Sequence, residues 1–406
     1  MAPLRLLTFS TLYPNDQQPN HGIFVENRLR HLVASGEVRS AVVAPVPWFP
    51  SGAAMFGAWA THARTARCES RHCLEVYHPR YLAIPKLGMS VSPWLLYHAT
   101  LPMIRRLCAA QEPPHAIDAH YVYPDGVAAT WLGKRLGLPV VITARGTDVN
   151  LIPRHAVPRR LIQGAIRDAA ALIAVSGALK QALVGLGAPP EKVTVLRNGV
   201  ETTLFHPPDD RATARAALGL TGPTLISVGL LIERKGHHRV IEAMASLPGY
   251  TLLIVGEGPE RSRLAAMIER RGLADRVRLL GSRPHAELPA LYGAADALVL
   301  ASSREGWANV LLEAMACGTP VIASNIWGNP EVVRTAAAGL ITESNTAEGI
   351  VAATHRLFAD PPDRAATRAY AEQFGWDETT DGQLRLFAGL VGTSAPLQGI
   401  SRGADN

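Results

Sequence analysis

Residues 302–320 read SSREGWANVLLEAMACGTP and place two glutamates, Glu305 and Glu313, eight positions apart. Apolar runs at Ala297–Ala301 and Pro320–Ala323 flank this stretch, and they predict two buried parallel strands joined by a short helix. Both acids are therefore expected at the carboxyl edge of a parallel sheet, where open α/β sheets bind ligands. The residues after Gly306 begin the helix, whose free N–H groups suit a diphosphate. A surface loop and an amphipathic helix with two solvated glutamates would be the structural alternative.

The same alternation of short apolar strands and helices runs along the whole chain. It predicts the α/β class with parallel, doubly wound sheets. Because 406 residues exceed what one hydrophobic core usually serves, we expect two Rossmann-like domains whose sheets face an interdomain cleft. The expected strands are Leu4–Ser10, Val38–Val46, Ala116–His120, Pro139–Thr143, Ala171–Val175 and Val193–Leu196 in the first half, and Thr224–Val228, Thr251–Val255, Val277–Leu280, Ala297–Ala301 and Pro320–Ala323 in the second.

A turn-rich segment divides the chain. Residues 1–197 are expected to form the first domain, residues 198–210 a linker rich in prolines and turn formers, and residues 211–373 the second domain. Asn198 and Gly199 supply a turn in the linker, and Asn198 can also bond across the cleft. The cleft is the natural active site.

Composition excludes several classes of protein. Hydrophobic residues make up 48% of the chain and charged residues 18%, which is typical of a globular enzyme. The net charge of +6 is spread along the chain without a nucleic-acid-binding motif, so we expect anionic ligands or an anionic membrane face and no nucleic acid. The four cysteines form no metal-ligand pattern and are expected as reduced thiols in a cytosolic protein.

Any membrane contact is expected to be peripheral. No apolar run approaches the roughly 20 residues that span a bilayer. Residues Leu87–Leu107 combine Trp94 with Arg105 and Arg106, a mixture that suits an interfacial helix. A core-facing helix with a solvated basic end is the alternative.

Loops after the strands of the second half carry candidate donor-binding residues. Gly229 follows a strand and lets a ligand approach the backbone, while Arg234 and Lys235 can balance the charges of a diphosphate. The alternative for these charges is a solvated turn. Gly256 and Glu257 follow the next strand in a tight strand-to-helix turn.

Loops of the first half face the same cleft. Gly22 ends a long loop before a helix start that favours an anion, although a flexible surface insertion is the alternative. His120 ends one further strand, and Arg145 and Asp148 follow another. His120 and Asp148 are candidates for contact with an acceptor hydroxyl, and a structural role is the alternative for His120.

Taken in order, these segments resemble signatures of the retaining GT-B glycosyltransferases of the family-4 type. Glu305 and Glu313 match the E-x7-E pattern, residues 229–236 the G-R-L…K-G segment, residues 255–259 the V-G-x-G-P loop and residues 143–148 the T-x-H-G-x-D loop. The Gly22 loop is similar to that of bacterial exopolysaccharide, teichuronic-acid and exosortase-associated members. The resemblance also implies that residues 374–391 form a final helix crossing back to the first domain, and residues 392–406 are expected as a tail.

Two departures from the family pattern change the expected chemistry. Leu230 stands where the phosphate-binding arginine is usual, so the second cation is expected from Arg234 or Arg145. Arg145 stands where histidine is commonest, and an arginine with a pKa above about 12 cannot act as a base. Arg145 would instead stabilise the leaving phosphate or bind an anionic acceptor.

The resemblance implies transfer of a hexosyl unit, with retention, from a nucleoside-diphosphate sugar to a glycan or polyprenyl-linked acceptor in surface polysaccharide synthesis. Glu305 would position the sugar, Glu313 the ribose, and Asn309 and Val310 at the helix start the diphosphate. Arg283 follows a strand where the family cradles the nucleobase, and it is expected either to stack on the base or to remain in solvent.

No Asp-x-Asp occurs in the chain, so no metal or other cofactor is expected. The expected location is the cytoplasm, with peripheral contact at the inner membrane face as an option. A GT-B-fold nucleotide-sugar epimerase or hydrolase and a non-catalytic nucleotide-sugar-binding protein are the alternative functions.

Overall fold

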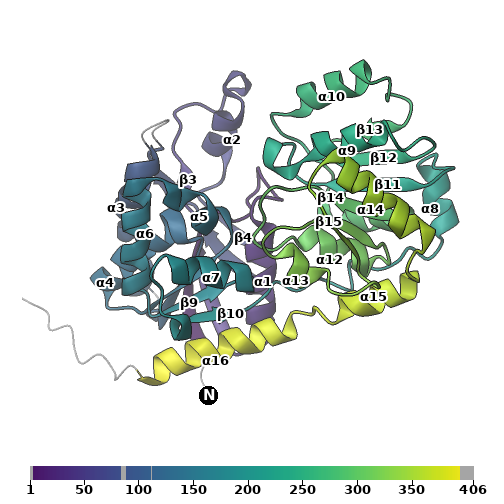
Figure 1. Cartoon of the computed structure of the whole chain (residues 1–406). Coiled ribbons are helices and arrows are strands. Elements are labelled where there is room, and N and C mark those ends of the chain that lie inside the picture. The colour runs from purple at the N-terminus through teal and green to yellow at the C-terminus, as the bar shows by residue number, and fades with distance from the viewer. Residues whose placement is uncertain (1–2, 84–87, 111, 394–406) are drawn as a thin grey trace, which may run out of the picture.

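The computed structural model describes residues 3–83, 88–110 and 112–393. Figure 1 shows two α/β domains side by side, the first in purple to teal and the second in green. Each domain holds one large sheet with helices packed against it, as the alternating sequence pattern predicts. The α/β class with parallel sheets is thereby confirmed.

The first domain contains an eight-stranded sheet in the order β10-β9-β8-β7-β1-β2-β5-β4 and a two-stranded sheet of β3 and β6. All neighbouring pairs are parallel except β4 and β5. The strands are β1 (Leu4–Phe9), β2 (Val38–Val43), β3 (Val46–Pro47), β4 (Cys68–Arg71), β5 (Leu74–Tyr77), β6 (Arg80–Tyr81), β7 (Ala116–His120), β8 (Val140–Ala144), β9 (Ala171–Ala174) and β10 (Val193–Val195). The α-helices are α1 (Ile23–Ala34), α2 (Ala58–Arg64), α3 (Gly88–Ala110), α4 (Val127–Leu136), α5 (Thr147–Asn150), α6 (Ala156–Asp168) and α7 (Gly177–Gly185).

The second domain contains a parallel six-stranded sheet in the order β13-β12-β11-β14-β15-β16. Its strands are β11 (Thr224–Val228), β12 (Thr251–Val255), β13 (Val277–Leu279), β14 (Ala297–Leu300), β15 (Val321–Ser324) and β16 (Gly339–Thr342). Its helices and those that follow are α8 (Arg211–Ala217), α9 (His237–Met244), α10 (Arg261–Arg270), α11 (Leu288–Ala294), α12 (Asn309–Ala316), α13 (Asn329–Val332), α14 (Ala347–Ala359), α15 (Arg364–Glu372) and α16 (Asp377–Thr393).

One expected strand is divided. The prediction of a single strand over Val38–Val46 is wrong, because β2 ends at Val43 and β3 begins at Val46 in a different sheet. Pro45 lies between them and has no N–H to donate to a ladder.

The strand order reverses at one point in each large sheet. The chain leaves β1 toward β2 on one side and returns to β7 on the other, and it does the same at β11 and β14. Crevices at such points, beyond the carboxyl ends of the strands, are the usual ligand sites of doubly wound sheets. The loops after β1, β7, β11 and β14 therefore form the candidate site.

The last helix returns to the first domain. Figure 1 shows α16, in yellow, running along the first domain. The side chain of Phe387 is fully buried there in a cluster with Leu6 and Leu32. The expected tail lies outside the described residues beyond residue 393.

Helix α3 corresponds to the candidate interfacial helix, apart from Leu87, which lies outside the described residues. Its middle faces the core, since Leu96, Thr100 and Ile104 are fully buried. Its first turns are different, because Trp94 is exposed. Within the described part of the chain, no helix combines the length and the apolar character that crossing a bilayer requires.

Candidate active site

Glu305 lies at the centre of a charged cluster in the loops that follow the neighbouring strands β11 and β14. Its carboxylate oxygen Oε1 accepts hydrogen bonds from Lys235 Nζ and from the Ser302 hydroxyl, both at 2.7 Å. Arg234 Nη1 is 3.8 Å from the other carboxylate oxygen. Lys235 and Arg234 follow β11, and Glu305 follows β14, so the reversal of strand order places the three side chains together.

Glu305 is ionised in this environment. The carboxyl group is buried, and burial alone would raise its pKa. The ammonium of Lys235 and the hydrogen bonds outweigh burial and hold the pKa of Glu305 below its ordinary value. The site therefore holds a buried carboxylate with two cations beside it.

Two glycines leave the backbone beside this cluster free of side chains. Gly229 has a φ of +152°, and a Cβ there would lie 3.5 Å from the Cδ and Cε atoms of Lys235. A Cβ on Gly256, which has a φ of +146°, would lie 1.9 Å from the carbonyl oxygen of Gly229. The backbone angle disfavours a side chain at Gly229, and both the angle and the lack of space exclude one at Gly256, so the two strand ends pack closely next to Lys235.

Glu313 lies on α12 and faces a second group of side chains. Tyr292 donates a hydrogen bond to Glu313 Oε2 at 2.9 Å, and His285 Nε2 is 3.5 Å from Oε1. Burial lowers the pKa of His285, but Glu313 outweighs burial and raises the pKa above its ordinary value. Glu305 and Glu313 thus have separate partners, one set cationic and the other aromatic and imidazole.

Arg145 of the first domain bonds to His120. Arg145 Nη2 is 2.7 Å from His120 Nδ1, and a guanidinium can only donate. His120 therefore accepts at Nδ1 and carries its proton on Nε2, which donates to Asp118 at 3.1 Å. Burial, with the nearby arginine, lowers the pKa of His120 despite Asp118, so the ring is neutral. Both ring nitrogens are engaged and the side chain is 1% exposed, so contact with an acceptor hydroxyl stays a prediction.

Asn198 connects the two domains. Its side-chain oxygen accepts from Arg145 at 3.0 Å and from Arg28 at 3.4 Å, and its amide nitrogen donates to Asn309 at 3.2 Å. Its carbonyl oxygen accepts from Trp307 Nε1 at 3.1 Å. The expectation that Asn198 bonds across the cleft is therefore confirmed, and sequence reasoning missed Arg28.

Two guanidinium groups are buried together in this network. Burial, with Arg28 close by, lowers the pKa of Arg145 to about 9, while Asp118 and Asp148 act in the opposite direction. Burial lowers the pKa of Arg28 to about 10. Both remain protonated at neutral pH, and Nε of each has no hydrogen-bond partner among the described residues.

Asp148 holds the loop that carries Arg145. Its fully buried carboxylate accepts from the backbone N–H groups of Val122 and Gly146 at 2.7 Å and of Arg145 at 3.2 Å. Burial raises the pKa of Asp148, and these hydrogen bonds oppose it. Its observed contacts are with backbone, and contact with an acceptor hydroxyl stays a prediction.

The loops of the two domains touch at Gly306. A Cβ on Gly306 would lie 1.9 Å from the carbonyl oxygen of Arg145, and one on Gly146 would lie 3.1 Å from the Gly306 nitrogen. Only residues without side chains allow this approach. The close contact brings the Glu305 loop next to the Arg145 loop.

A second contact between the domains was not foreseen. Glu331 of α13 accepts from the backbone N–H groups of Gly177 and Ala178 at 3.0 Å, which are the first residues of α7. Arg197 donates to the same carboxylate at 2.7 Å. A carboxylate from the second domain thus caps a helix of the first, in the favourable orientation for a helix dipole.

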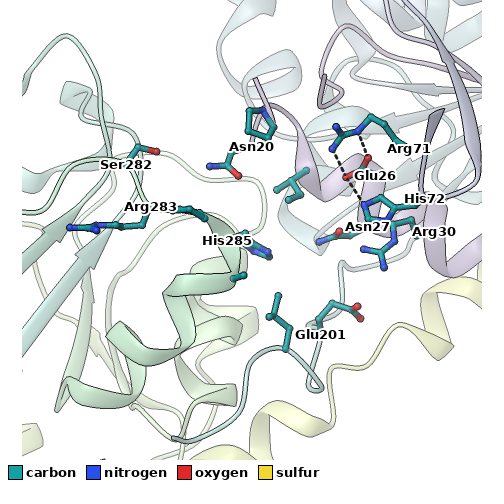
Figure 2. Close-up of a pocket in the computed structure, with 15 residues that line it drawn as sticks. Asn20, Glu26, Asn27, Arg30, Arg71, His72, Glu201, Ser282, Arg283 and His285 are labelled. Atoms are coloured by element: carbon teal, nitrogen blue, oxygen red, sulfur yellow. Dashed lines mark hydrogen bonds and ion pairs between the residues drawn. The ribbon is translucent and has the colours of Figure 1, made fainter. Parts of the chain in front are cut away.

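A cavity of about 490 Å³ lies beside the Glu313 group, between α1 and the loop after β13. Figure 2 shows His285 facing Asn27 and Arg30 across this cavity, while Arg283 turns away from it. Glu305 and Lys235 do not line the cavity. It therefore extends the candidate site beyond Glu313 and away from the charged cluster.

The remaining predicted residues lie at the margins. Arg283 is exposed and 3.7 Å from Glu287, and Glu257 accepts from Arg261 at 3.0 Å on the surface. Gly22 has a φ of +70°, and a Cβ there would lie 2.3 Å from the carbonyl oxygen of Leu12, so its glycine is required by the loop's own packing. Val310 is half-buried in the first turn of α12, next to Asn309.

Comparisons with known proteins identify the family of this chain. The family described as "Glycosyl transferases group 1" matches residues 210–374, and "Glycosyltransferase Family 4" matches residues 59–204. A D-inositol 3-phosphate glycosyltransferase of Segniliparus rotundus is 31% identical over 326 residues, which cover 73% of this chain and 72% of the relative. The enzyme of the same name from Mycobacterium bovis is 31% identical over 315 residues, 71% of this chain and 65% of the relative, so the chain spans just under two thirds of that protein.

Solved structures share the fold. Sucrose-phosphate synthase from Thermosynechococcus elongatus superposes with a TM-score of 0.78 at 21% identity, covering 97% of this chain and 100% of that one. Anabaena HepE in complex with UDP-glucose has a TM-score of 0.73 at 22% identity, covering 95% and 99%. The chain therefore belongs to the family-4 type of glycosyltransferases and has their GT-B fold of two Rossmann-like domains.

Proposed function

We propose that this glycosyltransferase moves a hexosyl unit, with retention of configuration, from a nucleoside-diphosphate sugar to a hydroxyl of a glycan or lipid-linked acceptor in surface polysaccharide synthesis. The observation that carries the proposal is the buried Glu305 carboxylate held by Lys235, at the point where the loops of both domains meet. Such a site offers an acceptor for sugar hydroxyls next to fixed cations for a leaving phosphate.

Related proteins support the donor class. Anabaena HepE has been solved with UDP and with UDP-glucose. The curated relatives are named D-inositol 3-phosphate glycosyltransferases, a name that specifies no donor. For this chain we propose a nucleoside-diphosphate sugar as donor, with its ribose at Glu313 and its base toward the cavity lined by His285.

The leaving diphosphate meets positive charge on more than one side. Lys235 and Arg234 come from the second domain, and Arg145 approaches from the first. The first N–H groups of α12, at Asn309 and Val310, add a helix N-terminus that favours anions. These groups stabilise charge that develops as the bond between the anomeric carbon and the phosphate oxygen breaks, and we propose that no metal takes part.

Glu305 positions the sugar in this scheme. Its Oε1 accepts from both Lys235 and Ser302, so we expect donor binding to share Lys235 between the carboxylate and a phosphate oxygen. The acceptor hydroxyl then attacks from the face that the phosphate leaves, and its proton passes to a phosphate oxygen. A new glycosidic bond forms on that same face, and contact between the domains excludes water.

Transfer assays with matched variants test the proposal. Glu305→Ala and Lys235→Ala should each lower transfer by at least about 100-fold, the effect of removing one electrostatic stabiliser, while the variants stay folded. Glu343→Ala and Lys134→Ala serve as controls, since both residues form ion pairs on the surface. Nuclear magnetic resonance of the product should show the anomeric configuration of the donor.

The products also separate the alternatives. Free sugar or an epimerised sugar nucleotide without transfer would point to a hydrolase or an epimerase. Donor binding without turnover in the wild type would point to a binding protein. Full activity in both site variants would overturn the assignment of the site.

A further inference from the structure

Large apolar side chains that are exposed gather at one end of the first domain. Ten such side chains occur among the described residues, and eight of them lie within residues 48–94. Met55 is 86% exposed, Trp94 55% and Trp48 51%. The eight residues, here called the 48–94 surface, are Trp48, Met55, Phe56, Trp59, Leu82, Met89, Val91 and Trp94.

Several elements join to make this surface. Strand β3 pairs with β6, and the backbone N–H of Trp48 donates to the carbonyl of Tyr81 at 2.7 Å, next to Leu82. Helix α2 packs on β3, and α3 packs on β6. The ring of Phe49 lies 5.3 Å from that of Phe56 and 5.6 Å from that of Trp59, measured between centroids. Figure 1 shows α2 standing out from the first domain on the side away from α16.

This surface costs free energy in water. Soluble monomers rarely expose a contiguous apolar patch of more than a few hundred Å². In the aromatic cluster around Phe49, Phe56 is still 41% exposed and Trp59 36% exposed. We therefore expect the 48–94 surface to be covered by a binding partner.

The charged residues around the 48–94 surface indicate which kind of partner it fits. Residues 46–68 and 79–110 contain no aspartate or glutamate, and they carry Arg64, Arg67 and Arg80. Arg64 and Arg67 are exposed. Asp16 contacts this region and accepts from the backbone N–H of Ala66 at 3.3 Å, and Glu69 and Glu75 lie between the two ranges. Exposed tryptophan, phenylalanine and methionine bordered by arginines are typical of surfaces that lie in the headgroup region of an anionic membrane.

We propose that the 48–94 surface docks the chain on an anionic lipid bilayer. The apolar side chains enter the boundary between headgroups and acyl chains, and the arginines contact lipid phosphates. A second copy of the chain fits less well, since a two-fold interface uses the same patch on both copies, and residues 46–68 and 79–110 offer arginines but no acid to pair with them. The surface belongs to the domain that carries Arg145 and His120, which suits delivery of a lipid-linked acceptor. The docking itself does not depend on the transfer reaction.

Vesicle flotation of the full chain, without donor or acceptor, tests the proposal. The wild type should float with phosphatidylcholine vesicles that contain about 30% phosphatidylglycerol and stay behind with pure phosphatidylcholine. Arg64→Gln with Arg67→Gln should lower the partition coefficient about 25-fold, since each arginine near an anionic surface contributes about fivefold. Met55→Ser with Phe56→Ser should lower it at least about tenfold by removing apolar area. Arg270→Gln with Arg271→Gln, on the second domain, changes charge equally and should leave flotation unchanged.

Three results would overturn the proposal: no flotation of the wild type, equal flotation on both kinds of vesicle, or unchanged flotation of the surface variants. Concentration-dependent dimers that Met55→Ser with Phe56→Ser abolishes, seen by light scattering without lipid binding, would assign the surface to self-association. Circular dichroism confirms that the variants fold. If the wild type transfers sugar to a short-chain, water-soluble acceptor but does not float with vesicles, only the docking proposal is wrong. If the wild type floats but transfers sugar to no acceptor, only the proposed function is wrong.

Discussion

Replacing Lys235 with methionine should destabilise the ligand-free protein. Lys235 Nζ bonds to Glu305 Oε1 at 2.7 Å, and the two side chains are only 15% and 8% exposed. Removing one partner of a buried ion pair costs about 3–5 kcal/mol because the other charge stays buried. Ser302 and Arg234 remain beside Glu305, so we expect the lower end, about 3 kcal/mol. For a domain of this size the transition should fall by about 6–12 °C.

Lys235→Met should reverse the pH dependence of the contribution that Glu305 makes to stability. In the wild type the pKa of Glu305 is below its unfolded value, so its favourable contribution is present above the unfolded pKa and is lost as pH falls through the folded pKa. Without Lys235, burial becomes the dominant effect and raises the folded pKa above the unfolded one. The contribution is then lost as pH rises, so Lys235→Met should lose most stability at neutral pH and less near pH ~5.

Thermal unfolding followed by circular dichroism, without ligand, measures this effect. Lys134→Met is the matched control, since Lys134 forms an exposed pair with Asp168 at 2.7 Å and exposed pairs contribute about 0–1 kcal/mol. Lys235→Met combined with Glu305→Gln removes both charges and should recover most of the loss. Equal transitions for Lys235→Met and Lys134→Met, or no recovery in the double variant, would refute the buried pair.

Other contacts give three further predictions. Gly306→Ala places a Cβ 1.9 Å from the carbonyl oxygen of Arg145, so small-angle scattering should show a larger radius of gyration and transfer should fall at least about tenfold. Gly375→Ala is the control, because a Cβ there meets nothing within 4 Å. Equal effects of the two substitutions would contradict the close contact between the domains. Glu331→Gln weakens the interdomain cap and should cost about 1–2 kcal/mol in thermal unfolding, and an unchanged transition would exclude a stabilising cap. Burial raises the pKa of Asp125 to about 7, so the contribution of Asp125 to stability is complete below the unfolded pKa and is lost as pH rises through about 7. Asp125→Asn should abolish this loss of stability with rising pH. Parallel curves of stability against pH for the variant and the wild type would contradict the prediction.

Continuous apolar runs made the buried strands predictable. The predicted strands at Thr224–Val228 and Thr251–Val255 coincide with β11 and β12, because strands covered on both faces need apolar residues throughout. The β4–β5 hairpin was missed, since the exposed residues of Cys68–Arg71 leave no apolar run. Tertiary pairing at the sheet edge, rather than local pattern, makes it a strand.

The charged cluster was partly visible in the sequence. Lys235 and Glu305 follow strands that the alternation identifies, so their meeting at one sheet edge could be expected. The cap formed by Glu331 could not, because its partners are backbone N–H groups 154 and 153 positions earlier in the chain. Backbone donors have no sequence signature, and only the packing of the two domains brings them together.

Ligand-dependent stability tests the central claim most directly. The claim is that the cleft binds a nucleoside-diphosphate sugar between Lys235 and Glu313. Thermal shifts should be measured with UDP-, GDP- and ADP-sugars on the wild type, Lys235→Ala and Glu313→Ala. The account predicts that one nucleotide class stabilises the wild type, by about 2.7 kcal/mol at 100 times its Kd, and that both variants lose this shift. No thermal shift of the wild type with any sugar nucleotide would contradict the claim. A shift in both variants as large as that of the wild type would also contradict it.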